Sequence, residues 1–408
     1  MASDVAIEVK NLYKIFGPNP QRGYERVRNG LDKEALLAES AHILGLNDVS
    51  LTIERGEIFV VMGLSGSGKS TLIRHFNRLI EPTAGSIIVD GVDVLALSYA
   101  ELQTLRRKKM SMVFQRFALL PHRTILRNVS YGLEIQDVAT EERERRAAEW
   151  VEAVGLTGYE NHYPAQLSGG MQQRVGLARA LCTDPEILLM DEAFSALDPL
   201  IRSQMQDQLI ELQARLKKTI VFITHDLDEA LRLGDHIAIL KDGVISQIGT
   251  PAEILLEPAD AYVRAFVKDV NRARALTVET VMRPPELRLT DEDLEAALTE
   301  MKRTGATRGF LVDKQGYRGV VTRDAVDEAI SKTPHPKISA IVEEGPSAPV
   351  GATIADALPG TLESDHPLAI VDKDGTLVGV VNRDRLGEIL APPDDGDEGG
   401  TEPSRAAA

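Results

Sequence analysis

The stretch that most restricts the fold of this 408-residue chain is VVMGLSGSGKSTLIRHFN, residues 60–77. Its apolar start predicts a buried strand, and the residues after Ser70 predict a helix. The loop between them fits the pattern G-x4-G-K-[ST], with the residues Gly63, Leu64, Ser65, Gly66, Ser67, Gly68, Lys69 and Ser70. A strand that passes into a helix through so short a loop indicates an α/β fold, in which helices cover a largely parallel sheet.

This loop has the chemistry of a phosphate site. Its glycines let successive backbone N–H groups face an anion, and the helix that follows adds its positive N-terminal end. Lys69 is expected to reach the β- and γ-phosphates of a nucleotide, and the Ser70 hydroxyl to bind Mg²⁺. A chance match in a glycine-rich loop is the alternative, and the flanking strand and helix favour phosphate binding.

Further apolar runs predict the rest of the sheet. Continuous β-branched segments, as found in strands covered on both faces, are Glu57–Gly63, Glu186–Glu192 and Thr219–His225. The segments SIIVDGVDV and HIAILKDGVISQIGTP each contain an Asp-Gly turn dipeptide, at Asp90 and Asp242, and we expect both to form antiparallel hairpins.

Two helices are predicted from capping residues and apolar spacing. In TEERERRAAEWVEAVGL the apolar residues recur at helical intervals, with Thr140 as the expected N-cap and Gly155 as the stop. A second, short helix is expected from Asp32 to about Ser40, within a polar segment that precedes the phosphate loop.

Two carboxylates follow the apolar residues of EILLMDEAFSALD. The apolar run carries Asp191 and Glu192 to the end of a strand. Asp191 is then placed to hold Mg²⁺, directly or through water, and Glu192 to take a proton from an attacking water. An acidic strand end without a catalytic role is the alternative.

The segment LSGGMQQRVGLARAL supplies another helix N-terminus that can bind an anion. Ser168, Gly169 and Gly170 precede a helix that carries Arg174 and Arg179, but no lysine accompanies them. This segment can therefore complete a phosphate site, although it would hold ATP poorly alone.

LSGGMQQR, between the phosphate loop and the strand-end carboxylates, resembles the signature of the ATP-binding cassette (ABC) ATPase family. The resemblance covers Ile7 to about Asp269. It implies a P-loop NTPase of ABC type, with a mostly parallel core sheet, an antiparallel β subdomain and a helical subdomain. It also implies ATP and Mg²⁺ as cofactors, ATP hydrolysis as the activity, and Thr71 as a further nucleotide-binding residue.

The same resemblance implies roles for four more residues. Phe16 in YKIFG resembles the aromatic residue that stacks on adenine, with Tyr13 as the weaker candidate. Gln115 resembles the glutamine that senses Mg²⁺ and the attacking water. His225 resembles the switch histidine that contacts the γ-phosphate, and Asp198 lies in SALD, which resembles the D-loop. Core packing is the alternative for Phe16, and helix capping for His225.

The family implies a head-to-tail homodimer in which each ATP lies between the Lys69 loop of one subunit and residues 168–170 of the other. One chain would then carry two incomplete phosphate sites. The family also implies a peripheral position at the cytoplasmic face of the plasma (inner) membrane, on permease subunits that dock near residues 116–127. Phe117, Leu119 and Leu120 suit such docking, although packing within the subdomain also explains them.

An insertion at about residues 17–45 narrows the resemblance. EIFVVMGLSGSGKSTLIRHFNRLIEPTAG and MVFQRFALLPHRTILRNVSYGLEIQ resemble the ATPase subunits of glycine betaine/proline importers, which carry this insertion and a C-terminal pair of CBS modules. The implied function is energy coupling for osmoprotectant import, with the solute bound by a separate extracytoplasmic protein. A different cargo (choline, carnitine or an amino acid) stays open, and a soluble non-transport ABC ATPase is the rival class.

An internal repeat resembles that CBS pair. VDKQGYRGVVTRD, ending at Asp324, returns as VDKDGTLVGVVNRD, ending at Asp384, and each copy predicts strand, glycine turn, strand and helix. Both aspartates resemble a ribose-binding residue, with helix capping as the alternative. The modules are expected to bind a nucleotide or cyclic dinucleotide, or to sense ionic strength. The expected domains are the ATPase at 1–270, CBS modules at 277–333 and 334–391, and a disordered acidic tail at 392–408.

Composition restricts the function further. The net charge of −16 argues against a nucleic-acid partner, which would need a basic face. Cys182 is the single cysteine, so no intramolecular disulfide can form. No apolar run approaches the ~20 residues that span a bilayer. The acidic tail and basic residues such as Arg272 and Lys337 suggest a salt-sensitive latch, with a merely solvating tail as the alternative.

Overall fold

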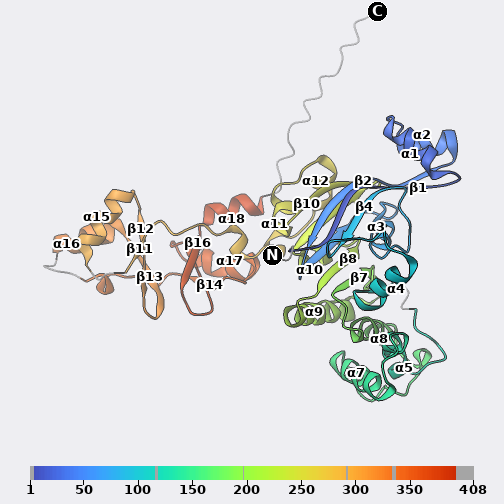
Figure 1. The fold of residues 1–408 in the computed structure, drawn as a ribbon. Coiled ribbons are helices and arrows are strands. Elements are labelled where there is room, and N and C mark those ends of the chain that lie inside the picture. The colour runs from blue at the N-terminus through green and yellow to red at the C-terminus, as the bar shows by residue number, and fades with distance from the viewer. Residues whose placement is uncertain (1–3, 115–117, 196, 291–292, 333–336, 392–408) are drawn as a thin grey trace, which may run out of the picture. The chain divides into compact units, whose positions relative to one another are not determined.

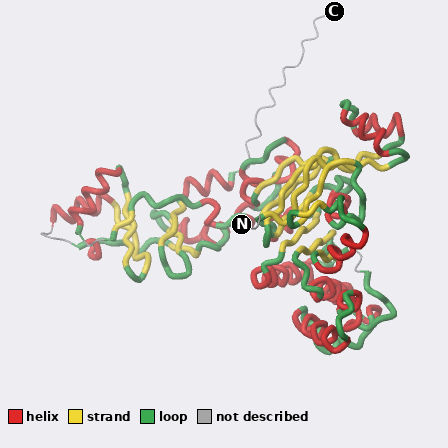
Figure 2. The backbone as a smooth tube through the Cα atoms, in the orientation of Figure 1, coloured by secondary structure: helices red, strands yellow, loops and turns green. Residues whose placement is uncertain are grey.

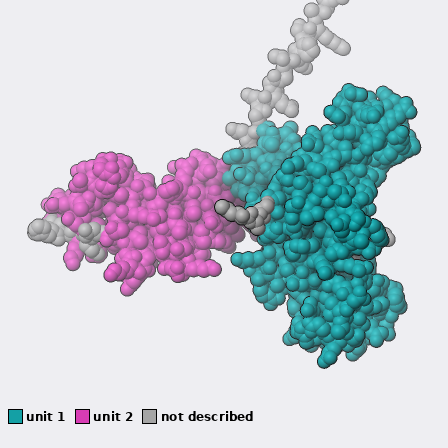
Figure 3. Space-filling model, in the orientation of Figure 1, with its two compact units in different colours: residues 1–266 teal, residues 267–408 magenta. Residues whose placement is uncertain are grey.

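The computed structural model describes residues 4–114, 118–195, 197–290, 293–332 and 337–391. The chain divides into two compact units, Met1–Phe266 (unit 1) and Val267–Ala408 (unit 2), which Figure 3 shows in separate colours. No helix in the described part of the chain is long and apolar enough to cross a bilayer.

A six-stranded sheet forms the centre of unit 1. Its strand order is β10-β9-β3-β8-β7-β6, and all neighbours are parallel except β10 and β9. The strands are β3 (Ile58–Met62), β6 (Met110–Val113), β7 (Ile187–Asp191), β8 (Thr219–Thr224), β9 (His236–Lys241) and β10 (Val244–Gly249). Every residue of β3, β7 and β8 is buried, which confirms the three continuous apolar strands predicted from the sequence.

A second, antiparallel sheet has the order β2-β1-β4-β5. Its strands are β1 (Val5–Phe16), β2 (Ile43–Glu54), β4 (Ala84–Val89) and β5 (Val92–Asp93). The strands are drawn in yellow in Figure 2. The hairpins predicted at Asp90 and Asp242 are both present. One apolar cluster joins this sheet to the central one, because Ile7 and Val49 pack with Phe59 and with Leu72 of helix α3 (Lys69–Phe76).

A helical cluster of unit 1 (Figure 1) contains α5 (Ile125–Val129), α6 (Tyr131–Ile135), α7 (Thr140–Ala153) and α8 (Gly169–Cys182), and α8 also contacts strand β6 of the central sheet. Leu119 packs against the core of this cluster, which supports internal packing for that residue. The predicted N-cap of α7 is wrong: Ala139 holds that position without a side-chain bond, and Thr140 is the first helical residue. Gly155 follows the helix with a φ of 70°, as a helix stop does.

Five further helices of unit 1 lie around the sheets. They are α4 (Tyr99–Lys108), α9 (Pro199–Leu216), α10 (Leu227–Leu233), α11 (Pro251–Leu256) and α12 (Ala261–Val267), which runs one residue into unit 2. Helix α10 packs on β3 and β8 of the central sheet. In the sequence, α10 begins at Leu227, shortly after β8 ends at Thr224.

The insertion folds as two short helices, α1 (Pro20–Arg28) and α2 (Lys33–Ser40). The prediction of α2 is confirmed: Asp32 caps it by accepting from the Ala35 N–H at 2.8 Å. The sequence analysis missed α1, although proline at the first helical position was a signal for it. Leu36 of α2 packs with Ile15 and Leu44, at the facing ends of β1 and β2, and forms a small core of its own.

Unit 2 contains the predicted repeat. After α13 (Arg272–Ala275) and α14 (Val278–Val281), the first copy comprises β11 (Arg288–Leu289), α15 (Leu294–Thr304), β12 (Arg308–Asp313), β13 (Gly316–Thr322) and α16 (Arg323–Lys332). The second copy comprises β14 (Ser347–Pro349), α17 (Ile354–Glu363), β15 (Leu368–Val371), β16 (Leu377–Val381) and α18 (Arg383–Leu390). Each copy has a three-stranded sheet with one parallel and one antiparallel pair, and Phe310 and Val320 of the first pack with Ala369 and Leu377 of the second.

Helix capping does not explain the two repeat aspartates. Asp324 is the second residue of α16, and the Thr322 hydroxyl accepts from the Ala325 N–H at 3.3 Å at that helix start. Asp384 is likewise the second residue of α18, whose N-cap is Asn382. The capping interpretation of both is therefore wrong, because their side chains stand in the first turn of a helix that begins before them.

Candidate functional site

Lys69 lies where β3 passes into α3 through the glycine-rich loop. Its side chain is 4% exposed, and its ammonium donates to the carbonyl oxygens of Gly63 at 2.8 Å and Leu64 at 3.0 Å. Burial lowers the pKa of Lys69, while the carboxylates of Glu192 and Asp191 oppose that shift. A side chain at Gly63 would place its Cβ 2.2 Å from the Leu240 carbonyl, so the loop needs glycine there.

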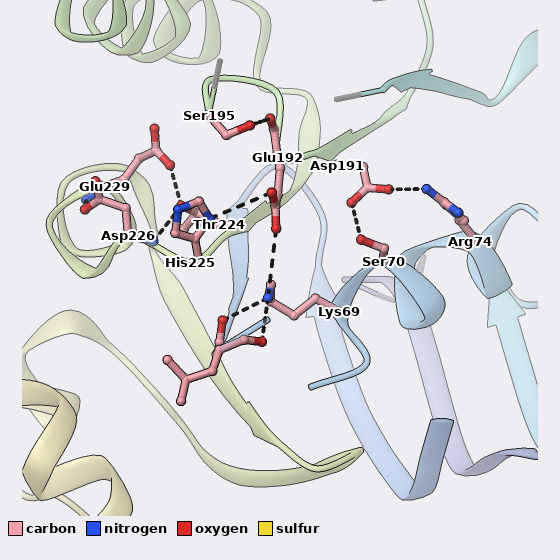
Figure 4. A network of polar contacts seen from close by, with 12 residues as sticks. Lys69, Ser70, Arg74, Asp191, Glu192, Ser195, Thr224, His225, Asp226 and Glu229 are labelled. Carbon is pink, nitrogen blue, oxygen red and sulfur yellow. Dashed lines mark hydrogen bonds and ion pairs between the residues drawn. The ribbon is translucent and has the colours of Figure 1, made fainter. Parts of the chain in front are cut away.

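The side-chain oxygen atoms of Ser70 and Asp191, which are both possible metal ligands, lie close together (Figure 4). The Ser70 hydroxyl donates to Asp191 Oδ1 at 2.7 Å, and the Arg74 guanidinium donates to Asp191 Oδ2 at 3.0 Å. Asp191 ends the buried strand β7, and its side chain is almost wholly buried. A hydroxyl and a carboxylate fit the ligand preference of Mg²⁺, which takes its other ligands from water and substrate phosphates. Gln115, the third predicted metal-site residue, lies outside the described residues.

Glu192 stands between Lys69 and His225 (Figure 4). One carboxylate oxygen lies 4.0 Å from the Lys69 ammonium, and the other lies 3.8 Å from His225 Nδ1. The residue has a φ of 47°, in the left-handed region that residues with a side chain rarely adopt. Its N–H donates to the Ile223 carbonyl of the neighbouring strand at 3.1 Å, which holds the strained turn in place.

A buried network supports the turn that carries His225. The Thr224 hydroxyl donates to a carboxylate oxygen of Glu229, and Gln206 donates to the other at 3.0 Å. The Asp226 N–H donates to the Thr224 oxygen at 3.0 Å, so His225 lies between two anchored neighbours. Burial raises the pKa of Glu229. Sequence reasoning missed Glu229, although a carboxylate four residues after a strand-end histidine was visible in VFITHDLDEA.

A cavity of about 470 Å³ is lined by residues of the phosphate loop, by Glu192 and by residues of the insertion. From the phosphate loop and its surroundings, the residues that line it are Ser65, Gly66, Gly68, Lys69, Ser70, Thr71 and Glu192. Phe16 also lines it and is 37% exposed. Tyr13 instead packs edge-on against Tyr24 of α1, with ring centroids 4.9 Å apart. The same cavity includes four insertion residues that the sequence analysis did not propose as site residues: Lys33, Ile43, Leu44 and Gly45.

The signature residues lie elsewhere in unit 1. Ser168 caps α8 by accepting from the Met171 N–H at 3.4 Å, and a Cβ at Gly169 would meet no atom of the described residues within 4 Å. A Cβ at Gly170 would come within 2.7 Å of Ile201, so this glycine lets α8 approach α9 closely. Asp198 caps α9 by accepting from the Ile201 N–H at 3.0 Å. None of the described residues lining the Lys69 cavity comes from α8 or α9.

The fold and this cavity together define an ATPase of the ATP-binding cassette class. The family model described as ABC transporter matches residues 46–195, and the one described as CBS domain matches residues 278–332. Among solved structures, the ATP-binding cassette MJ0796, in a dimeric post-hydrolysis state bound to ADP and Pi, is 35% identical. It covers 60% of this chain and 98% of its own, with a TM-score of 0.51.

Curated relatives match almost the whole chain. The glycine betaine/carnitine transport ATP-binding protein GbuA of Listeria monocytogenes is 48% identical, over 94% of this chain and 96% of its own length. The glycine betaine/proline betaine transport system ATP-binding protein ProV of Salmonella typhimurium is 44% identical, over 95% and 98%. The chain belongs to the same family of ABC transporter ATP-binding subunits, and it is an ATP-hydrolysing enzyme.

Proposed function

We propose that this chain is the energy-coupling subunit of an importer for glycine betaine and related quaternary amines. Relatives that match nearly the full length support the proposal: GbuA and ProV share glycine betaine in their names and differ in the second solute. The chain would act at the cytoplasmic face of the plasma membrane, bound to permease subunits, while a separate extracytoplasmic protein binds the solute. Hydrolysis at the Lys69 cavity would drive the transport cycle.

The observation that carries the enzymatic part is the position of Glu192 between Lys69 and His225. We assign the loop N–H groups and Lys69 to the nucleotide phosphates, with Phe16 against the adenine. Ser70 and Asp191 would hold Mg²⁺, which supplies charge neutralisation to the phosphates when bound. Glu192 would accept the proton of the attacking water, and His225 would hold the γ-phosphate. Gln115 is proposed to complete the metal and water contacts.

A head-to-tail homodimer would complete the site. The N-terminus of α8, with Ser168 as its cap and an open surface at Gly169, has the chemistry of an anion site but does not line the Lys69 cavity. A second subunit that presents residues 168–170, with Asp198 beside them, would supply the missing side. The dimeric ADP-bound cassette that resembles unit 1 supports this arrangement.

The repeat in unit 2 is proposed to regulate transport. Its two copies pack together through Phe310 and Leu377. Asp324 and Asp384 stand in the first turns of α16 and α18, and a ligand role for each is part of the proposal, beside the favourable effect of a carboxylate on the helix dipole. The ligand would be an adenine nucleotide or a cyclic dinucleotide, and ionic strength is the competing signal. The latch proposed for the tail involves residues outside the described ones, and Arg272 already donates to the carbonyls of Ile389 and Ala391.

Glu192→Gln tests the assignment of the base. The variant keeps the shape of the residue and removes its proton acceptor, so it should bind ATP and form a stable dimer but hydrolyse ATP about a hundredfold more slowly. Glu186→Gln is the matched control, because Glu186 precedes the same strand at its opposite end and pairs with Lys109. Turnover at the parental rate by Glu192→Gln would refute the assignment.

The cargo is tested by reconstituting the subunit with its permease and solute-binding protein in vesicles. Glycine betaine should stimulate ATP hydrolysis more than choline, carnitine or proline does. Stimulation by another solute alone would keep the enzyme assignment and replace the cargo.

A further inference from the structure

The insertion borders the nucleotide cavity, and one of its residues carries a charge there. Lys33, the first residue of α2, lines the cavity together with Phe16, Lys69 and Glu192. Its ammonium lies 2.7 Å from Oδ1 of Asp242, in the turn between β9 and β10. A lysine in the first turn of a helix opposes the positive end of the helix dipole, so α2 gains no stability from its charge.

The partner of Lys33 is itself attached to the phosphate loop. Asp242 and Gly243 both occupy left-handed positions of their turn, with φ of 50° and 82°. The next residue, Gly243, donates its N–H to the Ser67 carbonyl at 2.9 Å and accepts from the Asn47 N–H at 2.8 Å. The ion pair therefore holds the Lys33 ammonium beside the loop that binds phosphate.

The backbone around Lys33 is held in place by packing and by a hydrogen bond within the insertion. Leu36, one turn along α2, is fully buried against Ile15 and Leu44. His42 Nε2 lies 2.7 Å from the Pro18 carbonyl and joins the two ends of the insertion. Because the backbone at Lys33 is held in this way, little ordering of the chain is needed for its side chain to bind a ligand.

We propose that Lys33 is a second cationic nucleotide-binding residue, supplied by the insertion, whose ammonium attracts the phosphates of the nucleotide held by Lys69. The proposal rests on ATP binding at the Lys69 cavity. Asp242, which is 63% exposed, carries a single negative charge, whereas a nucleoside triphosphate brings several into the cavity that Lys33 lines. The ammonium then turns from the carboxylate toward the phosphates, or is shared between them.

The test is nucleotide affinity of the full chain carrying Lys33→Met, measured by calorimetric titration with ATP, ADP and adenosine at low salt. An ion pair between a partly exposed lysine and a phosphate contributes up to about 1 kcal/mol, so ATP affinity should fall about fivefold. ADP affinity should fall less, because ADP carries less charge, and adenosine affinity should not change. Lys10→Met is the matched control, because Lys10 is an exposed lysine of β1 that pairs with Glu8 away from the cavity.

Asp242→Asn separates a nucleotide contact from a structural ion pair. If Lys33 binds phosphate, removal of its competitor should leave ATP affinity unchanged or raise it. An equal loss of ATP affinity in Asp242→Asn and Lys33→Met would show that the pair only holds the insertion in place, and would overturn the proposal. Parental ATP affinity in Lys33→Met, or an equal loss for ATP and adenosine, would also overturn it. Undiminished ATP binding by Lys69→Ala would refute the site itself, a result independent of Lys33.

Discussion

Lowering the pH is expected to destabilise unit 1 through His75, a fully buried residue of the phosphate-loop helix α3. The Nδ1–H of His75 donates to the Thr71 carbonyl at 2.5 Å, and its Nε2 has no hydrogen-bond partner among the described residues. A proton at Nε2 would therefore create a buried charge without a partner. Burial lowers the pKa of His75 from 6.5 to about 4.

The sign and size of the effect follow from the two pKa values. Between pH 6.5 and pH 4 the unfolded chain binds a proton at His75 and the folded chain does not, so the folded state loses stability as the pH falls. The contribution is fully present above about pH 6.5. At about 1.4 kcal/mol per pKa unit, it lowers the free energy of unfolding by about 2 kcal/mol between pH 7.5 and pH 5.

Urea unfolding of the parent and of His75→Met at both pH values measures this contribution. Trp150 is the only tryptophan and lies in unit 1, so its fluorescence follows that unit and not unit 2. His75→Met should lose about 2 kcal/mol of the pH dependence, while a change at the exposed His122 to Met should lose none. An identical pH dependence in His75→Met and the parent would refute the reasoning.

Three more outcomes are expected. Phe16→Ala should raise the KM for ATP about tenfold without lowering kcat, whereas Tyr13→Leu should leave both unchanged; steady-state hydrolysis distinguishes them. Glu229→Gln should lower kcat about tenfold at unchanged ATP affinity, because it disturbs the hydrogen bonds that support the turn carrying His225. Equal changes in kcat and in ATP affinity would contradict this prediction. Burial raises the pKa of the Cys182 thiol to about 12, so native protein should react with iodoacetamide far more slowly than unfolded protein, by mass spectrometry.

The sequence alone was sufficient to group four of the candidate site residues. The glycine-rich loop and the apolar run before Asp191 each depend on local pattern, and parallel strands bring their carboxyl ends to one edge of a sheet. Lys69, Ser70, Asp191 and Glu192 therefore had to meet there once the strands were recognised, and the structure places them together. The repeat in unit 2 was readable for the same reason, because each copy forms its strands from neighbouring residues.

Only the tertiary structure could show that Phe16 and Lys33 line the Lys69 cavity while Tyr13 packs against Tyr24. The register shifts of β1 between Val9 and Ile15 break the simple alternation of a strand, so the face of each aromatic residue could not be read from spacing. Lys33 meets Asp242 across 209 residues of chain. Such a contact leaves no local periodicity in the sequence, because it exists only when distant segments pack against each other.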